Sequence, residues 1–194
     1  HRDSFVHTLA DYFRQAGCEV TTLRHGFGSE HYARVDPQLV VLSPGPARPD
    51  SFNMRETWRE LAERDLPAFG VCLGLQGLVE FCGGTLNQLA MPMHGKASRI
   101  VCEPSALFEG LPQAFSVGRY HSLYAAPDVF PSELEVLARA EPDGCIMAVA
   151  HRVRPWSAVQ FHPESILSMS EDCGLRLIRN VVRSVRTDTP LAHS

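Results

Sequence analysis

Residues 68–76 read Ala-Phe-Gly-Val-Cys-Leu-Gly-Leu-Gln and join two local patterns. The apolar run Ala68–Val71 predicts a buried β-strand, and the residues from Gly74 onward predict a helix. Cys72 lies on the turn between them, with Gly70 and Gly74 two positions away on either side. A nucleophile on a tight strand-to-helix turn, flanked by glycines that let neighbouring backbone pass, is typical of a nucleophile elbow. The segment therefore predicts a strand-turn-helix unit with a candidate nucleophile at its bend.

The neighbouring segments continue the alternation of strand and helix. Leu39–Leu42 is a second apolar run, which ends at the turn sequence Ser-Pro-Gly-Pro of residues 43–46, and Met54–Arg64 has the spacing of an amphipathic helix. Strands that alternate with helices are joined by crossover connections and run parallel. We therefore predict an α/β fold with an open, mostly parallel sheet and helices on both of its faces.

The outer parts of the chain add two helices and several short β-segments. Apolar residues recur at helical spacing from Phe5 to Ala16, ahead of Gly17, which can end a helix in the left-handed conformation. Cys173–Val185 predicts a helix packed on the sheet, because its apolar residues share one face. Further β-segments are predicted at residues 19–23, 99–102, 115–117, 135–140, 145–150 and 157–160. Several of those in the second half are expected to be antiparallel additions to the sheet.

The composition describes one ordinary globular domain. A chain of 194 residues with 44% hydrophobic residues and a net charge of −4 has the size and core of a single domain, which we place at residues 1–186, followed by a polar tail at 187–194. No block of Lys and Arg appears, so no nucleic-acid partner is expected. The apolar runs are far shorter than the ~20 residues of a membrane span, and no secretory signal is visible. We therefore expect a cytoplasmic protein without a membrane partner.

The six cysteines show no spacing of a metal site or a redox motif. A domain of this length does not need disulfides to fold. We expect most of the cysteines to be reduced core residues and predict no metal site.

A second motif supplies the groups that a cysteine nucleophile requires. Such a nucleophile needs a base, and the base needs a group that orients it. Residues 158–164 read Ala-Val-Gln-Phe-His-Pro-Glu, and in an extended backbone positions 162 and 164 point to the same side. Glu164 can then hold the imidazole of His162, which accepts the proton of the thiol. Alone, Cys72 could be an ordinary core residue and His162 a surface histidine; their presence in one chain favours catalysis.

Several motifs together resemble the class I (triad) glutamine amidotransferases. They are Ser-Pro-Gly-Pro at 43–46, Gly-Val-Cys-Leu-Gly-Leu-Gln at 70–76, Met-His-Gly-Lys at 93–96, Gly-Arg-Tyr-His-Ser-Leu at 118–123 and Phe-His-Pro-Glu-Ser at 161–165. The motifs at 93–96 and 118–123 are similar to the chorismate-linked branch, of the anthranilate synthase component II type, and look most like the amidotransferase portion of a fused anthranilate synthase. The resemblance covers nearly the whole chain and implies a flavodoxin-like fold.

The resemblance also implies a reaction and a set of site residues. Cys72 would attack the side-chain amide of L-glutamine to form a γ-glutamyl thioester, His162 would be the acid and base, and Glu164 would orient it. The oxyanion would be held by the backbone amides of Leu73 and Gly45. The glutamine substrate would be bound by Gly45, Pro46, Ala47, Gln76, Ser122 and Leu123.

The ammonia released would pass to a chorismate-using synthase domain or subunit, which would make anthranilate. An aminodeoxychorismate synthase or a phenazine-type aminochorismate synthase are the alternative acceptors. The segment from His94 to Lys96 is a candidate contact with this partner. The resemblance implies no cofactor or metal in this domain, and Mg²⁺ is expected in the chorismate-using partner.

Two departures from the family pattern carry expectations of their own. Ala47 stands where the family loop has glycine, so a positive φ there would strain the backbone and weaken glutamine binding. The family's first element is a hydrophobic strand that runs into the first helix, and this sequence begins after it. We therefore expect a portion of a longer polypeptide, such as the carboxyl part of a fused synthase.

Two other classes of protein share parts of this pattern. A cysteine peptidase or another triad hydrolase would have the elbow and the histidine but no need of Gln76 or the segment 120–122. A regulatory relative without activity would have no need of Cys72, His162 and Glu164. Release of glutamate from glutamine, without cleavage of peptides, separates these alternatives.

Overall fold

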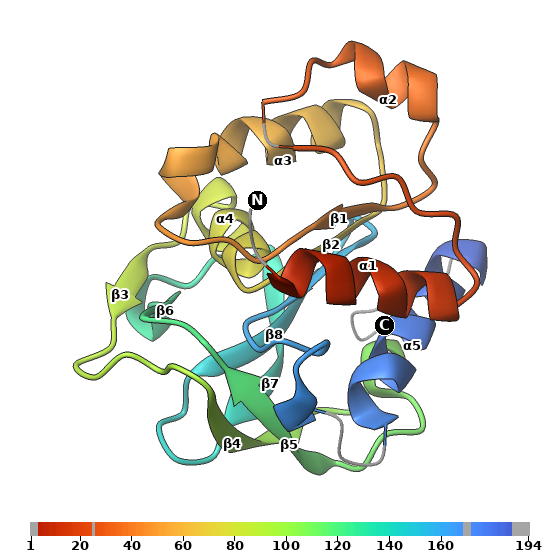
Figure 1. Ribbon diagram of the computed structural model, residues 1–194. Helices are drawn as coiled ribbons and strands as arrows, with labels where there is room; N and C mark the ends of the chain where they lie inside the picture. The colour runs from red at the N-terminus through yellow and green to blue at the C-terminus, as the bar shows by residue number, and fades with distance from the viewer. Residues whose placement is uncertain (1–3, 25, 169–171, 188–194) are drawn as a thin grey trace.

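The computed structural model describes residues 4–24, 26–168 and 172–187. Within them a seven-stranded sheet has the order β1-β2-β9-β8-β7-β4-β5 (Figure 1). Its strands are β1 (Val40–Leu42), β2 (Ala68–Val71), β4 (Lys96–Cys102), β5 (Ala114–Arg119), β7 (Leu134–Ala140), β8 (Ile146–His151) and β9 (Trp156–Val159). β1, β2 and β9 are parallel neighbours, and the four remaining pairings are antiparallel. The α/β class with antiparallel additions is confirmed, and the antiparallel part extends over more of the sheet than its parallel part.

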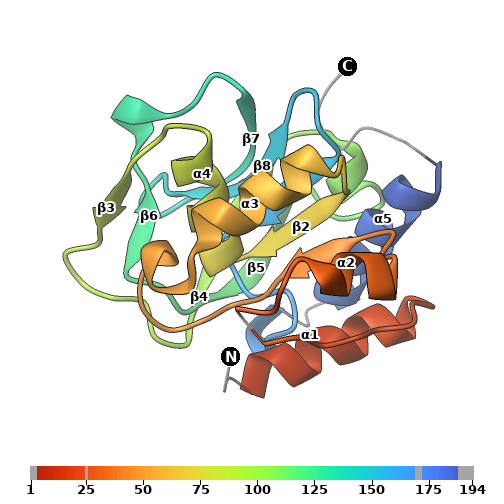
Figure 2. The same ribbon diagram turned by 90° about the horizontal axis from the view of Figure 1, so that it is seen from above.

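Helices cover both faces of the sheet, as predicted (Figure 2). α1 (Ser4–Gln15) and α5 (Cys173–Thr187) lie on one face, whereas α3 (Met54–Glu63) and α4 (Leu73–Phe81) lie on the other, together with the short α2 (Glu30–Val35). Alternate residues of β2 face the two cores: Phe69 and Val71 pack with α1 and α5, and Ala68 packs with α3 and α4.

The helix and strand predictions agree with the structure at most elements. The helix before Gly17 ends there with a φ of 86°, and the β-segments of the second half form β4, β5, β7, β8 and β9. Two features were not predicted from the sequence: α2 and a small antiparallel pair, β3 (Leu86–Gln88) with β6 (Leu123–Ala125). Short 3-10 turns occur at Pro49–Phe52, Ala106–Phe108, Pro127–Val129 and Ile166–Ser168.

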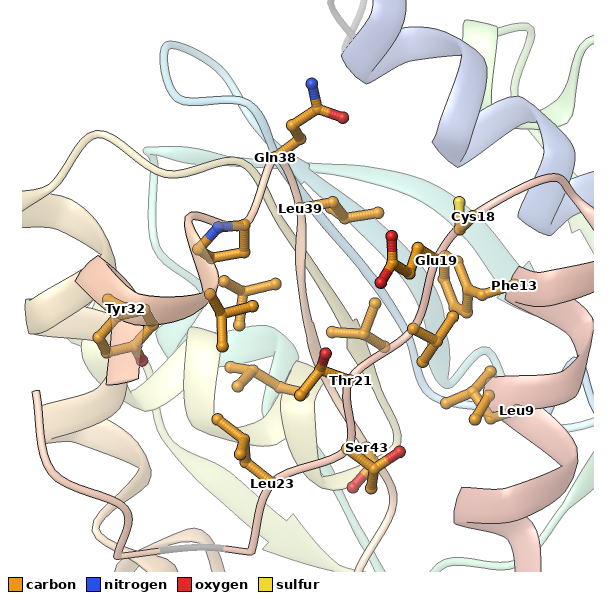
Figure 3. A pocket seen from close by; sticks show the side chains of 18 of the residues that line it. Leu9, Phe13, Cys18, Glu19, Thr21, Leu23, Tyr32, Gln38, Leu39 and Ser43 are labelled. Atoms are coloured by element: carbon orange, nitrogen blue, oxygen red, sulfur yellow. The ribbon is translucent and has the colours of Figure 1, made fainter. Parts of the chain in front are cut away.

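The prediction of a strand at 19–23 is wrong. This segment runs beside the outer edge of β1 without pairing to any strand in the described part of the chain. A groove of about 590 Å³ is lined by this segment and by Leu39–Leu42. Figure 3 shows Thr21 and Leu23 on one side of it, Leu39 across from them, and Leu9 and Phe13 of α1 on its wall. Strands pair only when they lie about 4.8 Å apart, so β-forming residues without a neighbour at that distance stay irregular.

Other expectations concern the ends of the chain and its cysteines. All six cysteines are free thiols, as expected. α5 continues to Thr187, and the rest of the predicted polar tail, 188–194, lies outside the described residues. None of the helices in the described ranges combines the length and the apolar character needed to cross a membrane.

Candidate active site

The three parallel strands bring the separated sequence motifs to one edge of the sheet. Leu42 of β1 lies opposite Gly70 of β2, and Val71 lies opposite Val159 of β9. Parallel strands in this register end together, so the segments that leave their carboxyl ends are neighbours. These segments are the loop at 43–47, the turn at Cys72, and residues 160–164.

The turn at Cys72 has the geometry of a nucleophile elbow. The backbone of Cys72 has φ 53° and ψ −94°, a conformation that costs a non-glycine residue about 1–3 kcal/mol, and its N–H donates to the carbonyl of Val159 at 2.7 Å. A Cβ on Gly70 would lie 2.7 Å from the carbonyl carbon of Gly74. A Cβ on Gly74 would lie 2.6 Å from the carbonyl oxygen of Leu42. The flanking glycines are therefore required by neighbouring backbone, as predicted.

His162 faces Cys72 on one side and Glu164 on the other. Its Nδ1 lies 2.9 Å from Oε1 of Glu164, and both residues are only 3% exposed. Burial alone would lower the pKa of His162, but hydrogen bonds with Cys72 and Glu164 outweigh burial and raise the pKa to about 10. The site thus favours an imidazolium between the sulfur and the carboxylate.

The backbone and the ring of His162 are held by neighbouring segments. Its N–H donates to the carbonyl of Gly118 at 3.0 Å, and the hydroxyl of Ser168 donates to the carbonyl of His162 at 2.7 Å. The rings of Phe5 and Tyr120 lie beside the imidazole, with centroids 4.6 and 5.1 Å away. The imidazole is therefore confined on several sides.

Gln160 is a site residue that the sequence analysis missed. Its Nε2 lies 3.5 Å from Sγ of Cys72, its Oε1 accepts from Nε2 of Gln76 at 3.4 Å, and the residue is fully buried. The sequence did contain a sign of its role. Gln160 is a polar residue at the end of an apolar strand and stands two positions before His162 and four before Glu164. It links the candidate nucleophile to the predicted glutamine-binding residue Gln76.

The structure brings some of the other predicted residues together. Nε2 of Gln76 also donates to the carbonyl of Leu123 at 3.2 Å, while the neighbouring carbonyl of Ser122 accepts from Leu89 at 2.7 Å. Leu73 is the first residue of α4, so its N–H lies among the amides that have no partner within the helix.

The loop after β1 is more exposed than the rest of the site. Gly45 is half-buried, and Pro46 and Ala47 are exposed. The structure places this loop at the same sheet edge as Cys72 and Gln76, and within the described residues no hydrogen bond joins it to either of them. Ala47 has a φ of 74°, which meets the condition under which strain was expected there.

Fold and site together define a class of protein. A buried carboxylate holds an imidazole, the imidazole faces a cysteine on a strained turn, and this arrangement suits acyl transfer through a thiol on an α/β scaffold. The chain belongs to the class-I glutamine amidotransferase family, whose model matches residues 1–182.

Curated relatives agree with this assignment. The chain is 54% identical over 182 residues to an anthranilate synthase of Azospirillum brasilense; this match covers 94% of the chain and 25% of that protein, so the chain spans about a quarter of its length. It is 38% identical over 187 residues to anthranilate synthase component 2 of Methanocaldococcus jannaschii, covering 94% of the chain and 93% of that protein.

Among solved structures, a protein of Thermoplasma acidophilum has a TM-score of 0.81 at 20% identity, covering 96% of this chain and 92% of its own. A glutamine amidotransferase of Thermotoga maritima has a TM-score of 0.70 at 15% identity, covering 94% and 91%. At these identities the likeness concerns the fold.

Proposed function

We propose that this chain is the glutaminase component of an anthranilate synthase. It would hydrolyse L-glutamine to glutamate and ammonia, and a chorismate-using synthase domain or subunit would use the ammonia to make anthranilate for tryptophan biosynthesis. The observation that carries the proposal is the contact of His162 with both Cys72 and Glu164 at the carboxyl ends of the parallel strands. The two relatives named as anthranilate synthases support this choice of acceptor.

In the first half of the reaction, the sulfur of Cys72 attacks the carbonyl carbon of the glutamine side chain. The amides of Leu73 and Gly45 would stabilise the oxyanion that forms. His162 then donates its proton to the departing nitrogen, so ammonia leaves and a γ-glutamyl thioester remains on Cys72. Glu164 keeps the imidazole in place and balances its positive charge.

In the second half, His162 accepts a proton from a water molecule, which attacks the thioester carbon. The bond to sulfur breaks, glutamate leaves, and the thiolate and imidazolium are restored. The balance is glutamine and water in, glutamate and ammonia out. We assign substrate binding to Gln76, Ser122 and Leu123 together with the loop of Gly45, Pro46 and Ala47.

Ammonia must reach its acceptor as neutral NH₃, because the ammonium ion that dominates in neutral water has no free electron pair. A passage closed to solvent between the two sites meets this requirement. The segment from His94 to Lys96 is a candidate partner contact: it is exposed, and a Cβ built on Gly95 would lie 3.4 Å from the ring of Tyr120, which packs beside His162.

The test compares two sources of nitrogen in the natural protein with its synthase partner. Cys72→Ala should abolish anthranilate formation from glutamine and leave formation from added ammonium salts unchanged. Equal loss of both activities would contradict the assignment of Cys72. Formation of an aminodeoxychorismate or another aminochorismate in place of anthranilate would contradict the assigned acceptor and leave the glutaminase assignment standing.

A further inference from the structure

We propose that Arg119 and His121 are positioning residues for glutamine binding, which act by fixing the carbonyl of Leu123 and, through it, the amide of Gln76. The inference rests on the proposed glutaminase function. Neither Arg119 nor His121 has a hydrogen bond to Cys72 within the described residues, so their effect on the substrate would pass through Leu123 and Gln76.

The hydrogen bonds of this pair determine which nitrogen of His121 carries the proton. Nε of Arg119 lies 3.0 Å from Nε2 of His121, and Nδ1 of His121 lies 2.9 Å from the carbonyl oxygen of Leu123. A guanidinium can only donate hydrogen bonds, so Nε2 must accept. The ring proton is then on Nδ1, which donates to Leu123. Arg119 thereby selects the tautomer that can hold this carbonyl.

The carbonyl of Leu123 is the junction between this pair and the site. It accepts one hydrogen bond from His121 and a second from Nε2 of Gln76 at 3.2 Å. Nε2 of Gln76 also donates to Oε1 of Gln160 at 3.4 Å, and Nε2 of Gln160 donates to Sγ of Cys72 at 3.5 Å. A line of buried polar groups therefore runs from Arg119 to the candidate nucleophile, and the orientation of the Gln76 amide depends on the Leu123 oxygen.

The positive charge of Arg119 is balanced by the carboxylate of Asp143. The side chain of Arg119 is fully buried, and Nη1 lies 2.8 Å from Oδ2 of Asp143, whose side chain is 28% exposed. Burial of Asp143 opposes its ionisation, but the N–H of Cys145 and the guanidinium outweigh this effect and lower the pKa of Asp143. The carboxylate is thus ionised at neutral pH and balances the buried cation.

The same arrangement keeps His121 neutral. Burial and the neighbouring Arg119 lower the pKa of His121 to about 4. The ring therefore stays neutral at pH values well above 4, and Nδ1 keeps the proton that it donates to Leu123. His121 is thus held neutral between the buried cation of Arg119 and the carbonyl of Leu123, which belongs to the proposed glutamine site. Such a histidine is suited to positioning and not to proton transfer.

The test uses two substitutions that mimic different halves of the imidazole. The amide of asparagine reaches about as far as Nδ1, whereas the amide of glutamine reaches about as far as Nε2. His121→Asn should keep the donor to Leu123 and leave KM for glutamine within about twofold. His121→Gln should lose that donor and raise KM about tenfold, with a smaller change in kcat. Both variants are polar and of similar size, so each controls for the folding of the other.

A second readout separates positioning from general damage. Alkylation of Cys72 by iodoacetamide needs the thiolate but does not need the residues that bind glutamine. Its rate should therefore be the same in both variants and in the unaltered protein. An unchanged KM in His121→Gln, an equal rise of KM in both variants, or a parallel loss of alkylation would overturn the inference. If the unaltered protein does not hydrolyse glutamine, the proposed function fails together with the inference; hydrolysis with an unchanged KM in His121→Gln refutes the inference alone.

Discussion

Nδ1 of His162 lies 2.9 Å from Oε1 of Glu164, two positions further along the chain, and both side chains are buried. The pair is local, but the extended backbone expected from the sequence is wrong: Pro163 and Glu164 form a turn, closed by the N–H of Ser165, which donates to the carbonyl of His162 at 3.1 Å. Cys72, by contrast, reaches the imidazole only because β2 and β9 are parallel neighbours. The candidate triad thus consists of a pair of residues two positions apart and a third residue that the pairing of β2 with β9 brings to them.

The pKa of His162 should depend on both of its partners. Burial by itself lowers this pKa, and contacts with Cys72 and Glu164 raise it to about 10. Cys72→Ala and Glu164→Gln should therefore each lower the pKa of His162, as followed by NMR titration of the imidazole. Because the folded-state pKa is raised, the ionised imidazole stabilises the fold fully below about pH 6.5 and loses this effect as the pH rises through about 10. An unchanged titration in Cys72→Ala would show that the sulfur does not contact the ring.

Stability should fall in acid because of His121. Burial and Arg119, assisted by His162, lower its pKa to about 4, while the carbonyl of Leu123 and Asp143 act in the opposite direction. A depressed pKa means that the unfolded chain binds the proton more tightly, so about 3 kcal/mol of stability should be lost between about pH 6.5 and 4. Urea unfolding at several pH values should show this slope, and His121→Asn should flatten it. Identical slopes in the two proteins would assign the loss to other groups.

Ala47→Gly should improve glutamine binding. The φ of 74° costs an alanine roughly 1–2 kcal/mol, whereas glycine loses about 0.4–1 kcal/mol through the greater freedom of its unfolded chain. These two effects on stability oppose each other and leave a net change of about 1 kcal/mol or less, so KM is the sharper measurement. We expect KM for glutamine to fall a few-fold, because the methyl group is removed from the border of the proposed glutamine site and the loop is relaxed. A KM equal to that of the unaltered protein would contradict this prediction.

Gly74→Ala should damage the elbow. Its Cβ would lie 2.6 Å from the carbonyl oxygen of Leu42, and backbone at the end of β1 can yield only by displacing the loop that follows. We expect a loss of about 1–3 kcal/mol in the free energy of unfolding and a lower kcat/KM for glutamine. Gly28→Ala is the matched control, since its Cβ would meet only the flexible end of the Glu30 side chain. Equal effects of the two substitutions on stability would argue against a backbone clash at the elbow.

Most regular elements and the candidate nucleophile were predictable from local patterns. The run at Ala68–Val71 is apolar because β2 is fully buried, and burial of a strand is visible in the sequence itself. The run at Leu39–Leu42 also forms a strand, although only Leu42 in it is buried. The glycines beside Cys72 were informative for a similar reason, because a crowded turn excludes a Cβ. The pairing of His162 with Glu164 was predicted from their spacing, but the turn at Pro163 and Glu164, and not an extended strand, brings the two side chains together.

Other features depend on which segments meet in space, and no local pattern records that. Glu19–Leu23 has the composition of a strand and is none, because a groove lies where its pairing partner would have to be. The contact of Gln160 with Cys72, and the line from Arg119 through His121 to Leu123, join residues from different strands and loops. A hydrogen bond between distant segments is formed only after the sheet has set their register, so propensity and spacing alone could not have placed it.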